Sequence, residues 1–329
     1  MEHRANGAMA FRTIACLPAL TGAWRKQGGG LLYMTSDLFA AALTDLGMPE
    51  LQDKTIRSVN MVQIGRALTD TNLKPGIRAL VVYNSNPATI APNQNLVKQG
   101  LQREDLFCVV LEHFMTDTAR YADYVFPSTT QVEHMDVIGS WGSRYVSLNL
   151  PAAKAAGEAI PNSEFFRRLA KRLALTESYL YETDEQLARA TLSSGHPYMK
   201  GITYDRLVRE GWAALNLPEP WAPFASGNFP TPSKKCEFYS EQLGKSGKDP
   251  LPGYVPTGTD SKEYPLMLLT SKAAKYFLNS SHAGSRGKSG KGERVTDGSE
   301  VAEKRSNVRG AKGPCCLLPA PTTREARVR

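Results

Sequence analysis

The chain has 329 residues, 41% of them hydrophobic and 22% charged, and its formal net charge is +8 at pH 7. The length is sufficient for two domains with sizeable cores, and no apolar run approaches the roughly 20 residues that a membrane-spanning helix needs. The segment 285–329 holds eleven Lys and Arg against five Asp and Glu, so most of the positive charge belongs to a tail. Nucleic-acid-binding proteins more often carry such charge on a folded surface, which argues against nucleic acid as a partner of the body of the chain.

The first predicted elements are two helices. Residues 10–20 are mainly apolar and lead into Thr21-Gly22, which predicts a helix that ends before the loop Gly28-Gly29-Gly30. Residues 59–68 carry apolar side chains at helical spacing, and Pro75-Gly76 interrupts the chain after them.

Three short buried strands come next. Residues 77–83, 106–111 and 124–126 are apolar runs without alternation, which is typical of strands buried on both faces of a parallel sheet. A helix from Pro92-Asn93 to about Lys98, closed by Gly100, is predicted between the first two, and a short helix over 117–122 precedes the third. Strands that alternate with helices predict an α/β fold with a doubly wound, mostly parallel sheet, which we expect within residues 1–160.

Residues 161–262 are predicted to form a helical and extended connector. Its helices are expected at 162–174, where an Asn or Ser cap opens an amphipathic pattern, and at 184–191 and 204–214. The proline-rich stretch 215–258 is expected to be extended.

The last part of the chain predicts an incomplete domain and a tail. Residues 263–270 resume a strand pattern, so 263–284 is expected to begin a β-rich C-terminal domain that the following sequence does not complete. Residues 285–329 combine few apolar side chains with much Gly, Ser and charge, which predicts disorder.

The cysteines do not form a recognisable metal or redox motif. Cys16, Cys108, Cys236, Cys315 and Cys316 include no CxxC pair, and no histidine is spaced with them for a zinc site. We therefore expect reduced thiols, with Cys108 as a core residue of a strand. No signal peptide is recognisable in the first 30 residues, which predicts a cytoplasmic protein unless a leader precedes this sequence.

Polar side chains follow the first predicted strand. Asn84, Asn86 and Pro87 form a loop directly after it, where ligands bind in open α/β sheets. Asn side chains donate and accept hydrogen bonds, which suits a nucleobase or ribose. Ordinary turn formation explains Asn and Pro at these positions equally well.

A second polar group follows the next strand. Glu112 stands where an acidic residue holds ribose hydroxyls in other dinucleotide sites, or it is a solvated carboxylate. Thr116, Asp117 and Thr118 are candidates for capping the next helix, whose N-terminus also suits a phosphate. Asp123 is a candidate acceptor for a guanine edge, or a carboxylate that begins the third strand.

Several segments together resemble a known family. They are Ile14–Gly22 with Gly28-Gly29-Gly30, Tyr83–Ala88, Met115–Asp123, Thr231-Pro232-Ser233 with Glu237–Ser240, Asp249–Pro252, and Leu269-Thr270-Ser271 with Phe277–His282. Their order along residues 5–284 resembles the C-terminal half of a molybdopterin oxidoreductase of the dimethyl-sulfoxide-reductase superfamily, in its soluble branch with biotin sulfoxide reductase and the formate-dehydrogenase-like enzymes.

The resemblance implies a molybdenum or tungsten centre held by two molybdopterin guanine dinucleotides. The loops at Asn84–Pro87, Glu112 and Thr116–Asp123 would hold the guanosine and phosphates of one dinucleotide, and the loop that begins at Thr270 would approach the other. Residues 1–160 and 263–284 would then be partial dinucleotide-binding domains. The family's iron–sulfur cysteines and metal ligand have no match in this sequence, so an iron–sulfur cluster would belong to a missing N-terminal half.

Three functions follow, in order of preference. The first is a fragment of a molybdopterin-dependent oxidoreductase, inactive by itself, with a small-molecule substrate and an electron-transfer partner for the full-length protein. The second is a non-catalytic α/β module that binds a guanine nucleotide. The third is binding of nucleic acid by the basic tail, which would weaken steeply with salt.

Overall fold

The computed structural model describes residues 7–34, 36–44, 46–48, 51, 53–254, 266–270 and 315–319. The chain divides into two compact units, and one of them contains Thr35–Asn216. The other contains Met1–Met34, Leu217–Ser271 and a C-terminal segment that includes residues 315–319. Each unit is a set of residues that contact one another more than they contact the rest of the chain. The domain boundaries that we expected after residues 160 and 262 stay predictions.

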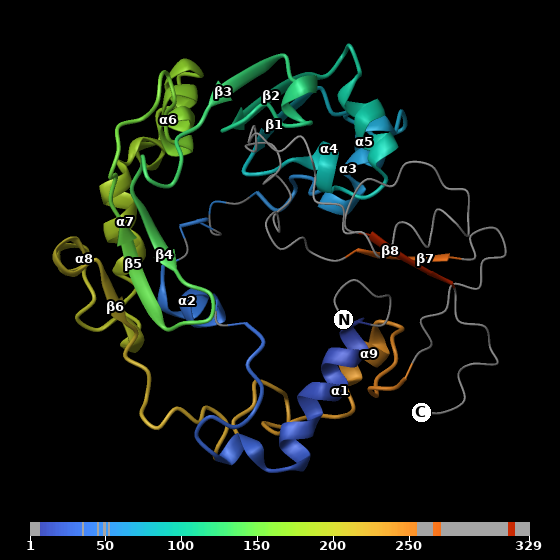
Figure 1. Ribbon diagram of the computed structural model, residues 1–329, viewed down its shortest axis with the longest axis vertical. Coiled ribbons are helices and arrows are strands. Elements are labelled where there is room, and N and C mark those ends of the chain that lie inside the picture. The colour runs from blue at the N-terminus through green and yellow to red at the C-terminus, as the bar shows by residue number, and fades with distance from the viewer. Residues whose placement is uncertain are drawn as a thin grey trace. The chain divides into compact units, whose positions relative to one another are not determined.

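A three-stranded parallel sheet lies in the Thr35–Asn216 unit, in the order β1-β2-β3 (Figure 1). The strands are β1 (Ala79–Tyr83), β2 (Phe107–Glu112) and β3 (Tyr124–Pro127). The predicted α/β fold with a parallel sheet is thereby confirmed.

Helices cover one face of this sheet. Leu68, Val82, Val97 and Val110 belong to the core between the strands and these helices. The helical elements around the sheet are η2 (Met61–Gln63), α3 (Ile64–Thr69), α4 (Pro87–Ile90), α5 (Gln94–Leu101) and η3 (Ala119–Tyr121).

Helix α5 runs through Gly100 rather than ending before it, as we had expected. A Cβ atom on Gly100 would lie 2.4 Å from the Cβ atom of Leu68 on α3. Gly65 of α3 meets α5 in the same way, since its Cβ would lie 2.8 Å from the backbone nitrogen of Val97. The glycine therefore serves close helix packing here and does not end the helix.

The opposite face of the sheet is exposed along β1 and β3, where we had expected strands buried on both faces, whereas Val109 and Leu111 of the central strand β2 are buried. Phe107 and Tyr124 are 50% and 59% exposed, and their rings lie 5.9 Å apart. At the carboxyl end of the sheet, Phe165 and Phe166 of α6 (Asn162–Arg172) pack against Phe126 and Tyr83 respectively.

A second sheet in the same unit is antiparallel, with the order β4-β5-β6. Its strands are β4 (Asp136–Gly139), β5 (Tyr145–Asn149) and β6 (Trp212–Ala214). The sequence analysis did not predict this sheet, and it assigned residues 212–214 to a helix. Gly211 ends that helix at a φ of 78°, and the next three residues pair with β5 instead.

Three of the remaining helices of this unit fall close to their predicted places, namely α6, α7 (Asp184–Leu192) and α8 (Tyr204–Glu210). Three further helical elements were not predicted, namely α2 (Ser36–Ala42), η4 (Ser178–Tyr181) and η5 (Pro197–Met199).

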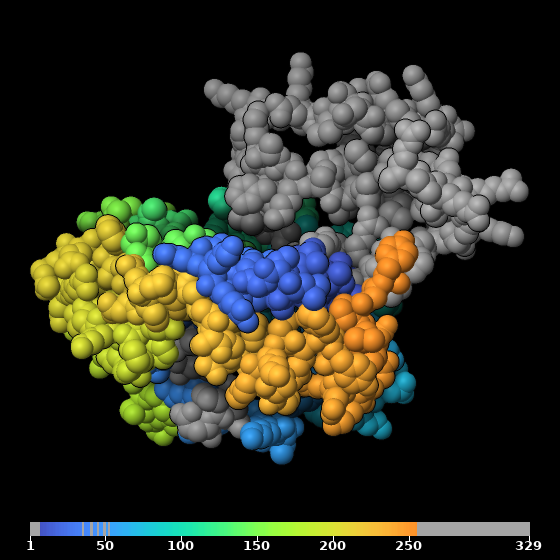
Figure 2. Space-filling model, turned by 90° about the horizontal axis from the view of Figure 1, so that it is seen from below, coloured from blue at the N-terminus to red at the C-terminus, as the bar shows by residue number. Residues whose placement is uncertain are grey.

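The second unit combines the N-terminal helix with the residues that follow Leu217. Helix α1 (Gly7–Leu20) lies against residues of the connector, as the blue and orange segments of Figure 2 show. The unit also contains η1 (Ala23–Arg25), α9 (Glu241–Lys245), β7 (Leu266–Thr270) and β8 (Cys315–Pro319).

Strand β8 departs from the disorder that we expected over residues 285–329. It pairs antiparallel with β7, and Cys-Cys-Leu-Leu-Pro is an apolar run within an otherwise polar tail. The rest of the tail, and residues 271–284 of the expected C-terminal domain, lie outside the described residues.

Candidate functional site

The parallel register places three strand ends at one edge of the sheet. Tyr83 pairs with Leu111, and Glu112 pairs with Pro127. Asn84, Glu112 and Ser128, the residues at or just past these ends, therefore share the carboxyl edge, where open α/β sheets bind ligands. We call this group of loops the strand-end edge.

The outer part of this edge is a chain of three polar side chains. The Asn162 Nδ2 group donates a hydrogen bond to Asn84 Oδ1 at 3.0 Å. The Oδ1 atom of Asn162 accepts a hydrogen bond from Ser128 Oγ at 2.8 Å. Asn84 is exposed and has a φ of 52°, in the left-handed region that Asn tolerates better than most residues. Sequence reasoning treated Asn162 only as a helix cap and missed this role.

The inner part is a buried network between the loops that follow β1 and β2. Asn86 is 4% exposed and Thr118 fully buried. Asn86 Oδ1 accepts hydrogen bonds from Thr118 Oγ1 at 2.7 Å and from Thr118 N at 3.2 Å. The same hydroxyl oxygen accepts from the Ala88 N–H at 3.0 Å. These two predicted site residues therefore fix the loops to each other, and their bonded atoms face the interior.

The turn after β2 is capped by its own side chains. The buried Thr116 accepts from the Ala119 N–H through Oγ1 at 3.4 Å and from the Arg120 N–H through its carbonyl at 3.2 Å. The first N–H groups of this single 3-10 turn thus already have acceptors, since Thr118 N bonds Asn86. The structure supports the capping interpretation of Thr116 and leaves these N–H groups occupied where a phosphate had been considered.

Asp117 and Pro87 lie on the outside of the same two loops. Asp117 is exposed, and its Oδ2 accepts a hydrogen bond from Thr89 Oγ1 at 2.8 Å. Pro87 occupies the first position of α4, where its missing N–H costs no hydrogen bond. Both residues sit beside the buried network, with the carboxylate of Asp117 accessible to solvent.

Glu112 offers the one acidic group at the end of the central strand. Its side chain is 14% exposed. Oε1 accepts a hydrogen bond from the His113 N–H at 2.8 Å, and Oε2 accepts none from the described residues. The neighbouring His113 Nε2 lies 2.9 Å from the Thr129 carbonyl oxygen, which can only accept, so this nitrogen carries the proton. A half-buried carboxylate with one open oxygen is suited to accept hydrogen bonds from a ligand.

Glu133 shapes the loop after β3, and sequence reasoning missed it as well. Its Oε2 accepts hydrogen bonds from the Thr130 N–H and hydroxyl, and its Oε1 accepts one from the Ala156 N–H. These bonds hold the pKa of Glu133 below its ordinary value, so the carboxylate stays charged at neutral pH. The spacing Thr130 to Glu133 is that of a capping box, a signal that sequence analysis could have used.

Asp123 does not join the strand-end edge. It precedes β3 and lies at the amino ends of the strands, where its Oδ2 accepts a hydrogen bond from the Cys108 N–H at 2.6 Å. Burial, with a smaller contribution from the Asp123 charge, raises the pKa of the Cys108 thiol to about 11. Thr270 ends β7 in the other unit, and its side chain lies outside the described residues.

The residues that the structure describes contain neither a recognisable metal site nor a helix that could span a membrane. No group of three or more His, Cys, Asp or Glu side chains there has the arrangement of a metal site. Within the same residues, no helix combines the length and apolar character that a membrane crossing requires.

Comparison with known proteins matches residues 1–172 to the molybdopterin oxidoreductase family. Probable oxidoreductase YoaE of Bacillus subtilis is 41% identical over 281 residues, which cover 85% of this chain and 40% of that protein. The assimilatory nitrate reductase catalytic subunit of Bacillus subtilis is 30% identical over 207 residues, which cover 61% of this chain and 28% of that protein.

A solved structure has the same fold in part. Acetylene hydratase from Pelobacter acetylenicus superimposes with a TM-score of 0.50 at 29% identity, and the match covers 63% of this chain and 28% of that one. The chain thus spans two-fifths or less of the length of these relatives. Because the family match extends over more than half of the sequence, the chain belongs to the molybdopterin oxidoreductase family, whose members are enzymes.

Proposed function

We propose that this chain is part of a molybdopterin-dependent oxidoreductase and that its strand-end edge binds the nucleotide end of a molybdopterin guanine dinucleotide. The observation that carries the proposal is the Glu112 carboxylate at the end of β2, with one oxygen open to a ligand. The ribose hydroxyls and the guanine N1–H and N2–H groups are donors, so they match this acceptor.

The other residues of the strand-end edge have two proposed roles: some would contact the nucleoside, and the others hold the loops in place. Asn84 and Asp117 are exposed in the loops that follow β1 and β2, and they would complete the polar contacts to the nucleoside. Asn86, Thr116 and Thr118 are buried, so their role is to hold the two loops in place. We propose Asp123 as a structural residue of the sheet, because it lies at the opposite strand ends.

The bound cofactor, with molybdenum or tungsten, would supply two-electron chemistry at the metal. This chain would bind and orient its nucleotide end. A second dinucleotide near Thr270, a small-molecule substrate and an electron-transfer partner belong to the proposal for the whole protein. The relatives include one protein named as a reductase, the nitrate reductase catalytic subunit, and one named as a hydratase, acetylene hydratase. Because these names differ in reaction type, that the reaction is a redox reaction is itself part of the proposal.

The test is nucleotide binding to the 329-residue chain, measured by calorimetry with GDP and with ADP. We expect GDP to bind more tightly than ADP, because the carboxylate recognises the guanine donors. Glu112→Gln should weaken GDP binding by about tenfold or more, since a hydrogen bond to a charged group contributes roughly 1.5–3 kcal/mol.

Glu104→Gln is the matched control. Glu104 flanks the same strand at its amino end and is exposed, so this variant should bind GDP as the parent does. Equal binding of GDP and ADP, or equal loss in both variants, would contradict the proposal.

The alternative of a non-catalytic guanine-nucleotide module shares this binding test. The two are separated by pterin content after production in cells that make the molybdenum cofactor. A fluorescent pterin released from the purified chain, and lost in Glu112→Gln, supports the oxidoreductase; GDP binding with no pterin supports the module.

A further inference from the structure

Two half-buried cysteines that are distant in sequence meet in the unit formed by Met1–Met34 and Leu217–Ser271. Cys16 lies on α1, and Cys236 lies in the connector. Cys16 is close enough to Cys236 to raise the pKa of the Cys236 thiol, through its charge and a side-chain hydrogen bond, after the larger effect of burial. This pair is separate from the strand-end edge and does not depend on the function proposed for it.

Independent contacts explain why the two thiols meet. Arg12 precedes Cys16 by four residues and therefore lies on the same face of α1. Its Nη2 group donates hydrogen bonds to the carbonyl oxygens of Phe238 and Pro250, each at 3.0 Å. The connector is thus held on this face of α1 only two residues beyond Cys236, as the neighbouring α1 and α9 segments of Figure 1 show.

The segment around Cys236 is also fixed from within. The Glu237 carboxylate accepts a hydrogen bond from the Ser233 N–H at 2.9 Å, and the Ser240 N–H donates to the Pro250 carbonyl at 2.9 Å. These contacts flank Cys236 on both sides. The approach of the two thiols is therefore part of the packing of this unit.

We propose that Cys16 and Cys236 form a reversible disulfide when the protein meets a low-molecular-weight disulfide such as oxidised glutathione. The Cys16 thiolate attacks one glutathione sulfur, forming a mixed disulfide and releasing one glutathione. Cys236 loses its proton to water and attacks the Cys16 sulfur, releasing the second glutathione. Two protein thiols are oxidised, and one glutathione disulfide is reduced to two thiols.

The surroundings suit this order of events. Burial, followed by the neighbouring Cys16, raises the pKa of the Cys236 thiol, so little of the reactive Cys236 thiolate is present at neutral pH. Cys108 provides the contrast, because it is fully buried within β2 and no oxidant reaches it in the folded protein.

The bond would tie α1 to the connector by a covalent link between residues 16 and 236. A link that closes so long a loop lowers the entropy of the unfolded chain, and this stabilises the folded state. We expect oxidation to raise the apparent melting temperature of the chain by about 5 °C, and reduction to reverse the change.

Peptide mapping tests the proposal on the full chain. Trypsin cleaves after Arg12, Arg25, Lys235 and Lys245, so the two cysteines fall in peptides 13–25 and 236–245. After treatment with oxidised glutathione and alkylation, we expect these peptides joined and lighter by two hydrogen atoms than their sum. The joined species should disappear on reduction and be absent from Cys16→Ser and Cys236→Ser.

Two controls keep the result specific. Cys108→Ser should leave the joined peptide unchanged. Oxidation in urea should spread the pairing over all five cysteines, whereas the folded chain should join only this pair. Alkylation of both Cys16 and Cys236 after oxidation of the folded chain, or pairing as scattered as in urea, would overturn the proposal.

Discussion

The Thr118 hydroxyl is the most enclosed polar group of the strand-end edge. It donates to Asn86 Oδ1 and accepts from the Ala88 N–H, and the residue is fully buried. A buried group that loses its partner costs the full desolvation of that group. The stability of the two loops therefore depends on this hydroxyl more than on any exposed polar group near it.

Thr118→Val tests this dependence, because valine keeps the shape and removes only the hydroxyl. We expect the free energy of unfolding to fall by about 1–3 kcal/mol, measured by urea denaturation, since the Ala88 N–H is left without an acceptor. Thr89→Val is the control: its hydroxyl is exposed where it meets Asp117, so the change should stay within about 0.5 kcal/mol. Similar losses in both variants would show that burial of Thr118 is not the cause.

The residue types in these loops predicted where polar side chains gather. They did not distinguish an exposed side chain that could contact a ligand from a buried one that holds the loops together. Asn84 and Asn86 are two residues apart in the same loop, yet one is exposed and the other is 4% exposed. The difference depends on Thr118, which is 32 residues away from Asn86. Asn162 was missed for the same reason, because its partner Asn84 is 78 residues away.

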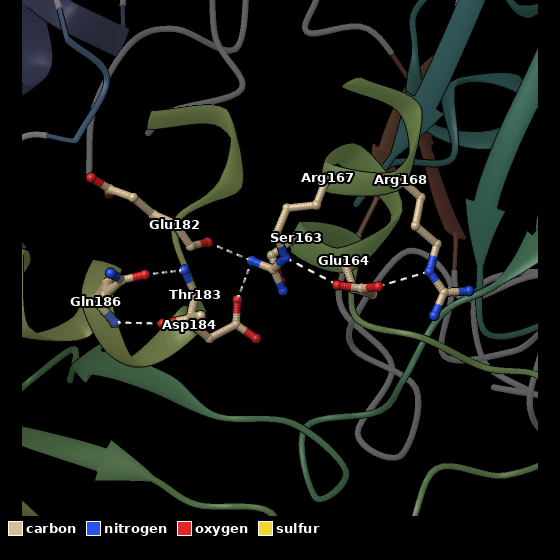
Figure 3. A network of polar contacts seen from close by, with 8 residues as sticks. All are labelled: Ser163, Glu164, Arg167, Arg168, Glu182, Thr183, Asp184 and Gln186. Carbon is tan, nitrogen blue, oxygen red and sulfur yellow. Dashed lines mark hydrogen bonds and ion pairs between the residues drawn. The ribbon is translucent and has the colours of Figure 1, made fainter. Parts of the chain in front are cut away.

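At the scale of elements, one arginine joins α6 to the start of α7 (Figure 3). The Arg167 guanidinium donates to Glu164 Oε2 at 3.0 Å, to Asp184 Oδ1 at 3.0 Å and to the Glu182 carbonyl at 2.9 Å. Its side chain is 18% exposed, so the network is partly shielded from water. Hydrogen bonds from Arg168 and Arg167 hold the pKa of Glu164 below its ordinary value of 4.5.

The depressed pKa gives the network a defined pH dependence. A carboxyl group whose pKa is lower in the folded state stabilises the protein above its unfolded pKa, and the effect is lost as pH falls through the folded pKa. We expect Glu164→Gln to lower the free energy of unfolding by about 1 kcal/mol at pH 7. The difference from the parent should shrink as pH falls below 4.5 and vanish once Glu164 is protonated.

Urea denaturation at pH 7, 5 and 3 measures this difference. Glu158→Gln is the control, because Glu158 is exposed and forms no ion pair among the described residues. A Glu164→Gln difference that stays constant from pH 7 to pH 3 would contradict the assignment.

The elements that sequence predicted best are those defined by local pattern. The three strands of the parallel sheet follow from short apolar runs, and α6 follows from an amphipathic period. Strand β6 was missed because it pairs with β5 across more than 60 residues, a contact that no local pattern records. The pairing of β4 with β5 is local, across residues 140–144, and was overlooked. Gly100 misled for a related reason, since its role is fixed by Leu68 on another helix.

At the scale of the whole molecule, the open face of the parallel sheet distinguishes this chain. Phe107, Tyr124 and Phe126 present adjacent rings there and are exposed. Parallel sheets are normally covered on both faces, and contiguous apolar patches are rare on soluble monomers. No sequence pattern marks this face as open, because strands buried on both faces have the same composition.

This face should bind an apolar fluorescent dye in the native state. We expect the double variant Phe107→Ser and Tyr124→Ser to lower the fluorescence of bound anilinonaphthalene sulfonate about twofold while the far-ultraviolet circular dichroism is unchanged, since exposed patches drive such binding. Trp141→Ser is the control, because Trp141 is 83% exposed but lies outside the sheet. Equal dye signals from the parent and the double variant would exclude this face as the binding surface.

The hydrogen bonds above the strand ends close chain loops of different length. The bond between Asn86 and Thr118 spans 32 residues, and the bond between Asn84 and Asn162 spans 78. Because closing a longer loop costs more chain entropy, the inner bond can form with the β1–β2 pair, whereas the outer one waits for α6. Opening follows the reverse order: Asn162 can release Asn84 and Ser128 together while the inner bond stays intact. We therefore expect the outer hydrogen bonds of the strand-end edge, those of Asn162, to open before the inner bond between Asn86 and Thr118.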